Sequence, residues 1–101
     1  MVLDMRPAQS SHSRHRGIGR YCVGLASALG ARHPDLIGSV LVDEGPPPAL
    51  PSVLAERADR MPPWRDRGVL HLQSPFEPDT TTAGMWPRPA SRAGVRLVVT
   101  V

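Results

Sequence analysis

The residues best suited to chemistry lie in one basic stretch, His12-Ser13-Arg14-His15-Arg16-Gly17-Ile18-Gly19-Arg20-Tyr21. Its glycines precede a segment with the apolar spacing of one buried helical face. The larger apolar side chains of that face are Ile18, Tyr21, Cys22, Leu25 and Leu29. Gly17 and Gly19 are therefore expected at a helix N-terminus, where unpaired N–H groups and the helix dipole favour phosphate or carboxylate.

Arginines flank these glycines on both sides, at Arg14, Arg16 and Arg20. Guanidinium groups form paired hydrogen bonds with phosphate oxygens, and a glycine lets a ligand approach the backbone closely. The stretch therefore predicts an anion site. Glycines before a helix are also common as simple turns, and arginines as solvated surface, so the surrounding elements must support the prediction.

The positioning elements alternate along the chain. Strands are expected at 2–5, 37–42, 69–72 and 95–101. Helices are expected at about 18–32 and 52–59. In the second helix we expect Ser52 as the N-cap and Val53, Leu54 and Ala58 on the inward face. The run Asp43 to Pro48 is expected to be a loop, and Asp79 to Gly94 irregular. This alternation predicts an α/β fold, a parallel sheet of about four strands with flanking helices, in a single domain over residues 1–101.

Parallel sheets of this kind bind ligands beyond the carboxyl ends of their strands. The residues expected there are Asp4 with the loop through Gly19, then Asp43 and Glu44, then Ser74 to Glu77. His71 alternates with two leucines in the third strand, which is typical of a packed histidine near that edge. Glu77 is suited to acid or base chemistry there, although a surface carboxylate is the simpler interpretation.

Composition limits the classes of partner. The 101 residues carry a net charge of +3, and every cationic side chain is an arginine. The arginines are spread from Arg6 to Arg96 rather than clustered, so nucleic acid is not expected as a ligand. The single cysteine, Cys22, excludes a disulfide within the chain. No signal peptide or transmembrane segment is predicted, which favours a cytoplasmic location.

Three other kinds of ligand site fit the sequence less well than the anion site. A dinucleotide-binding fingerprint would use Gly17 and Gly19, with the carboxylate of Asp43 binding the ribose. Two features argue against it: a long loop separates the first strand from Gly17, and Cys22 occupies the position of the third glycine. A P-loop needs a lysine, which the sequence lacks. His12 and His15 lack further ligands at a suitable spacing, so no metal is expected, and no cofactor.

Several blocks together resemble the N-terminal half-domain of family-four GT-B glycosyltransferases. They are Val2-Leu3-Asp4-Met5-Arg6-Pro7, Arg14-His15-Arg16-Gly17-Ile18-Gly19-Arg20-Tyr21, Leu25 with Ala28-Leu29, His71-Leu72-Gln73-Ser74-Pro75-Phe76-Glu77 and Val98-Val99-Thr100-Val101. The resemblance covers nearly the whole chain and is most specific in the Arg-Gly-Ile-Gly-Arg-Tyr block. It implies a partial Rossmann-like domain, the N-terminal part of a GT-B fold.

The resemblance also implies a function. Such enzymes are retaining transferases that move a sugar from a nucleotide-sugar donor to a saccharide or lipid-linked acceptor. By similarity, Gly17, Gly19, Arg16 and Arg20 would bind the donor diphosphate, and His15, Ser74 and Glu77 would lie on the acceptor side.

The likeness is incomplete, because the family continues into a His-Asp segment and a C-terminal domain with paired glutamates. The sequence stops inside its last β-prone segment, so we expect a fragment that is inactive alone and needs the missing C-terminal domain, with peripheral membrane contact left open for the longer protein. The alternative is a noncatalytic module that binds an anion or nucleotide, or that serves in protein interaction.

Overall fold

The computed structural model describes residues 1–9, 17–64, 68–72, 92 and 94–99. Its elements are β1 (Val2–Asp4), the 3-10 turn η1 (Arg6–Ala8), α1 (Gly17–Arg32), the 3-10 turn η2 (Pro34–Leu36), β2 (Ser39–Leu41), α2 (Ser52–Ala55), β3 (Ala58–Asp59), β4 (Val69–Leu72) and β5 (Arg96–Val99). The strands form one sheet in the order β3-β2-β1-β4-β5, and every neighbouring pair is parallel. The expected α/β, Rossmann-like architecture is confirmed.

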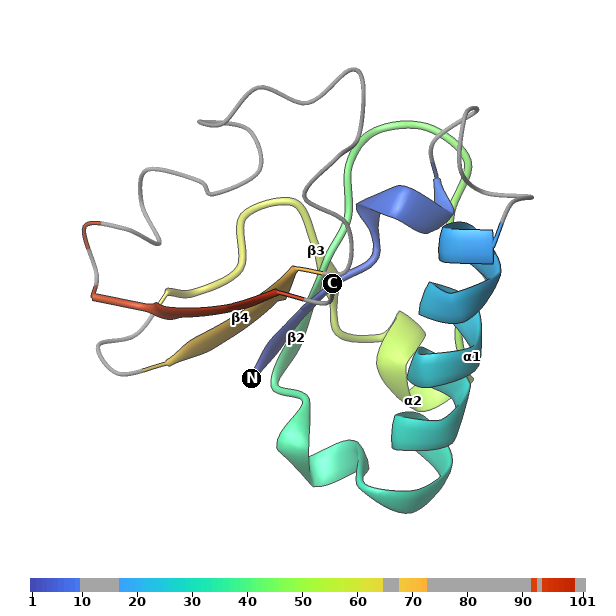
Figure 1. Cartoon of the computed structure of the whole chain (residues 1–101), viewed down its shortest axis with the longest axis horizontal. Coiled ribbons are helices and arrows are strands. Elements are labelled where there is room, and N and C mark those ends of the chain that lie inside the picture. The colour runs from blue at the N-terminus through green and yellow to red at the C-terminus, as the bar shows by residue number, and fades with distance from the viewer. Residues whose placement is uncertain (10–16, 65–67, 73–91, 93, 100–101) are drawn as a thin grey trace.

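Two apolar clusters lie on opposite faces of the sheet. On one face α1 and α2 cover β1 and β2 (Figure 1), and Leu3, Cys22, Val40 and Leu54 are fully buried between them. On the other face Leu70 packs with its neighbours in the second cluster, which consists of Leu41, Leu70, Val95, Val2 and Trp64. Adjacent strand residues divide between the clusters because successive side chains of a strand point to opposite faces.

The predicted strand count and second helix need correction. Five strands are described rather than about four, and the additional one is β3, because Ala58 and Asp59 pair with Val40 and Leu41 instead of extending a helix. Helix α2 therefore ends at Ala55. Ser52 is its first residue, the N-cap position is occupied by Pro51, and no side chain caps the helix.

The inward face of α1 agrees with the prediction except at Tyr21, and its centre is formed by smaller residues than expected. Its buried residues are Gly19, Cys22 and Ala26, whereas Tyr21 is 47% exposed. Ile18, Leu25 and Leu29 are only partly buried, along the margin of the cluster. Small side chains lie at the centre of this face, where α1 packs closely against η1.

Candidate functional site

The strand order defines where a ligand site is expected. Along the sequence the chain passes from β1 through β2 to β3 on one side, and then returns to place β4 on the other side of β1. The carboxyl ends of β1 and β4 are thus neighbours at the point where the strand order reverses. Open parallel sheets bind ligands in the crevice that forms at such a switch point.

Asp4 and Arg6 form the first charged pair at this point. The Arg6 Nε donates to Asp4 Oδ1 at 2.8 Å, Nη2 donates to Oδ2 at 3.2 Å, and the backbone N–H of Arg6 donates to Oδ1 at 3.1 Å. The turn η1 folds the chain back directly after β1, which brings Arg6 over the carboxylate two residues earlier. The guanidinium plane is consequently fixed at the carboxyl end of β1.

Burial dominates the chemistry of Asp4, whose side chain is 2% exposed. Loss of solvation raises the pKa of this carboxyl above its ordinary value of 3.8, the bonds and charge of Arg6 oppose that rise, and the charge of Asp43 adds to it. Asp4 therefore holds its proton to a higher pH than an exposed aspartate would.

His71 lies on the neighbouring strand at this edge. It is in register with Leu3 across the β1–β4 pair, and its side chain is half-buried. Burial lowers the pKa of its imidazole below the ordinary 6.5, and the negative charge of Asp4 partly opposes that effect. A neutral imidazole can both donate and accept a hydrogen bond, so His71 is chemically suited to orient a hydroxyl group.

The amino end of α1 lies at the same edge. Its first turn contacts η1, which directly follows β1 (Figure 1), so the positive end of the helix dipole is on the side where the strands end. Gly17 and Arg20 are exposed, whereas Gly19 is buried. The first turn of α1 contains no acidic residue, so no side chain of that turn neutralises the positive end of the helix dipole. A substitution at Gly17 leaves the packing intact, because an added Cβ meets no heavy atom within 4 Å.

The structure places only some of the predicted site residues. Asp4, Gly17, Gly19 and Arg20 lie at the carboxyl edge, as do Asp43 and Glu44 beyond β2. Arg14, His15, Arg16, Ser74 and Glu77 lie outside the described residues, and their assignments stay predictions. Sequence reasoning missed Arg6 and Gln9 as site residues. The spacing of Asp4 and Arg6 around a strand end offered a signal for the first, and nothing local signalled the second.

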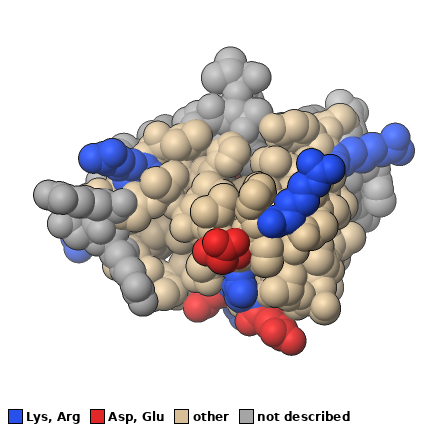
Figure 2. Space-filling view, turned by 90° about the horizontal axis from the view of Figure 1, so that it is seen from below, with Lys and Arg blue, Asp and Glu red and all other residues tan. Residues whose placement is uncertain are grey.

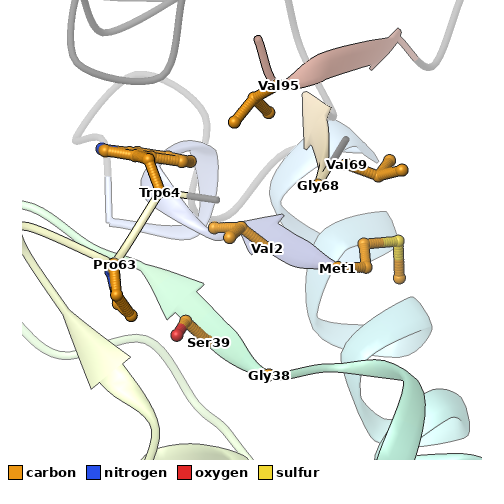
Figure 3. A pocket seen from close by; sticks show the side chains of 9 residues that line it. All are labelled: Met1, Val2, Gly38, Ser39, Pro63, Trp64, Gly68, Val69 and Val95. Atoms are coloured by element: carbon orange, nitrogen blue, oxygen red, sulfur yellow. The ribbon is translucent and has the colours of Figure 1, made fainter. Parts of the chain in front are cut away.

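The described part of the chain forms a pocket near each end of the strands. The larger, about 240 Å³, lies at the amino ends of β1, β2 and β4, with the Trp64 ring across from Val69 and Ser39 (Figure 3). It is on the edge opposite the Asp4–Arg6 pair and takes no part in the candidate site. The smaller, about 170 Å³, lies just past the carboxyl end of β2 and beside Ala58, the first residue of β3.

Charge on the surface is mixed rather than concentrated. On the face seen in Figure 2 the arginines lie apart, with acidic side chains among them. Among the residues described by the structure, no three His, Cys, Asp or Glu side chains come together as a metal site. The helices in this part of the chain are too short or too polar to cross a membrane.

No protein-family model matches this chain, and neither a curated protein nor a solved structure matches it. A functional assignment therefore relies on the geometry of the carboxyl edge and on the sequence resemblance described above.

Proposed function

We propose that the chain is the N-terminal, acceptor-side half-domain of a retaining GT-B glycosyltransferase of family four. In this proposal the longer enzyme transfers a sugar from a nucleotide-sugar donor to a saccharide or lipid-linked acceptor in the cytoplasm. A second Rossmann-like domain supplies most of the donor-binding residues, so the half-domain is inactive alone.

The observation that supports this proposal most is the meeting of three features at one edge. The switch point between β1 and β4, the Asp4–Arg6 pair and the amino end of α1 all lie where the strands end. A cleft between two such domains would open at this edge. The resemblance in the Arg-Gly-Ile-Gly-Arg-Tyr block points to the same end of α1.

The proposed chemistry uses the positive potential of this helix end. When the sugar leaves the donor, negative charge develops on the nucleoside diphosphate, and oriented N–H groups stabilise such charge without rearrangement. In the proposal the backbone at Gly17 and Gly19 approaches the diphosphate, and the guanidinium groups of Arg16 and Arg20 bind its oxygens.

Inorganic pyrophosphate is the simplest probe for this role. Titration of the chain, followed by backbone amide NMR, should shift the signals of Gly17, Ile18 and Gly19 with a common saturation curve. Gly17→Val should weaken binding at least about tenfold, because a side chain there hinders approach to the backbone. Gly38→Val is the matched control, since Gly38 is also exposed with open space around its Cβ but precedes β2 at the opposite edge.

Two outcomes would contradict the diphosphate role. Pyrophosphate could leave the signals of Gly17 to Gly19 unchanged, or Gly17→Val could bind pyrophosphate as tightly as Gly38→Val does.

The coding sequence downstream of Val101 separates the proposed enzyme from the noncatalytic alternative. A downstream His-Asp segment and a second domain support the transferase, whereas a natural stop after Val101 favours the noncatalytic anion-binding module.

A further inference from the structure

The smaller pocket adjoins the proposed site but belongs to a different pair of strands. It lies past the carboxyl end of β2 and beside Ala58, the first residue of β3, with a volume of about 170 Å³. Most of its wall is apolar and comes from Val42, Pro47, Pro48, Leu50, Ala55 and Ala58. A cavity of about 150 Å³ is enough to hold a benzene molecule, so this pocket can take one six-membered ring.

Gln9 gives this pocket a fixed wall. Its side-chain Oε1 accepts a hydrogen bond from the Asp43 N–H at 2.7 Å, and its Nε2 donates to the carbonyl oxygens of Asp43 at 2.8 Å and Pro46 at 3.2 Å. The amide thereby holds the start of the proline-rich loop against the end of η1. Because these polar groups are satisfied by one another, the wall that they form favours an apolar occupant.

Among the described residues that line the pocket, Asp43 is the one with an acidic side chain. Asp43 is exposed at the rim, and Glu44 follows it in the chain and pairs with Arg60. Of the described residues that line the pocket, none is cationic. A carboxylate accepts hydrogen bonds from hydroxyl groups and repels an anionic ligand.

We propose that this pocket is an acceptor subsite that takes one uncharged, hydroxyl-bearing ring, with its apolar face on Pro47 and Leu50 and its hydroxyl groups donating to Asp43. The identification as an acceptor subsite rests on the proposed function, whereas the preference for a neutral ring comes from the pocket itself. The carboxylate of Asp43 disfavours an acceptor that carries a carboxylate or phosphate on this ring.

Phenyl β-glucoside and phenyl β-glucuronide form a matched pair of probes, because they differ by one carboxylate. Titrations followed by backbone amide NMR should show the glucoside shifting the signals of Val42, Gly45, Ala55 and Ala58. The glucuronide should bind about fivefold more weakly, because its carboxylate and that of Asp43 repel each other by ~1 kcal/mol in water. Asp43→Asn should weaken the glucoside and remove most of the difference between the two probes.

Ala58→Phe should fill the pocket and abolish the shifts, while Ala28→Phe, at an exposed position of α1 away from the pocket, should leave them unchanged. If Ala58→Phe disturbs folding, Asp43→Asn still tests the subsite, because it changes one exposed side chain. Equal affinity for both probes, no saturable shift at the pocket, or unaltered discrimination in Asp43→Asn would overturn the proposal.

The pyrophosphate titration distinguishes this failure from that of the proposed function. Pyrophosphate binding at Gly17 to Gly19 without glucoside binding would refute the subsite alone. Glucoside binding without pyrophosphate binding would refute the diphosphate role of α1 and leave the neutral-ring pocket standing.

Discussion

At the scale of single residues, Asp4 affects both the stability of the fold and the charge at the carboxyl edge of the sheet. Its carboxylate is buried against Arg6, which is itself only 16% exposed. A buried ion pair is costly to desolvate, and the raised pKa of Asp4 shows that Arg6 offsets only part of that cost. The pair therefore serves the geometry of the edge more than the stability of the domain.

The pH dependence of unfolding tests this view. Unfolded Asp4 ionises near its ordinary pKa of 3.8, whereas the folded carboxyl stays protonated to a higher pH. The free energy of unfolding of the natural chain, relative to Asp4→Asn, should therefore fall as the pH rises from 3.8 to the raised pKa, and stay constant on either side of that window.

Urea denaturation at a series of pH values spanning this window measures the effect. Asp35→Asn, which removes an exposed carboxyl group from η2, is the matched control. If the difference between the natural chain and Asp4→Asn follows the same pH profile as the control, burial does not govern Asp4.

At the scale of elements, the close approach of α1 and α2 depends on a glycine. A Cβ built at Gly30 lies 3.0 Å from Cγ of Pro51 and 3.3 Å from Cδ1 of Leu54. Leu54 is fully buried and anchors α2 to the core. The absence of a side chain at Gly30 thus sets the distance between the two helices, and with it the position of the α2 wall of the smaller pocket.

Two glycines of the same helix should respond in opposite directions. Gly30→Val should destabilise the domain by about 1–3 kcal/mol, because the added atoms push against α2. Gly24→Ala should stabilise it by about 0.5–1 kcal/mol, because Gly24 is exposed with no heavy atom within 4 Å of its Cβ, and alanine favours the helix. Urea denaturation followed by far-UV circular dichroism measures both. A neutral or stabilising Gly30→Val would show that α2 does not need this approach.

At the scale of the whole molecule, β1 connects the two apolar clusters. Leu3 is buried with the helices on one face, and Val2 packs with Trp64 on the other. Because β1 lies at the centre of the sheet, neither cluster persists without it. We expect the domain to unfold as a single cooperative unit.

Leu3→Ala tests this cooperativity. Removing a fully buried leucine should cost about 2–5 kcal/mol, and the denaturation midpoint should shift equally by circular dichroism and by Trp64 fluorescence. A Trp86→Phe background leaves Trp64 as the one fluorescent tryptophan. Separate midpoints for the two signals would mean that the faces of the sheet unfold independently.

Local patterns predicted most of the elements correctly. Four strands and the long helix follow from runs and periodicities of apolar residues, and β4 has the bounds that the sequence predicted. The strand at Ala58 was missed because two exposed residues have no hydrophobic pattern, and only pairing with β2 makes them a strand. The inward face of α1 was predicted correctly at Cys22, Ile18, Leu25 and Leu29, and wrongly at Tyr21, which is exposed. The most buried positions of this face also include the small residues Gly19 and Ala26, which a pattern of large apolar side chains does not select.

The sequence by itself determined the alternation of strands and helices and the glycine-to-helix boundary at Gly17, because apolar spacing and backbone freedom are properties of neighbouring residues. The tertiary structure alone decided the strand order, the electrostatic influence of Asp4 on His71 and the hydrogen bonds from Gln9 to Asp43. These depend on pairing between segments far apart in the chain, and the free energy of that pairing comes from buried area and register, which no local pattern specifies.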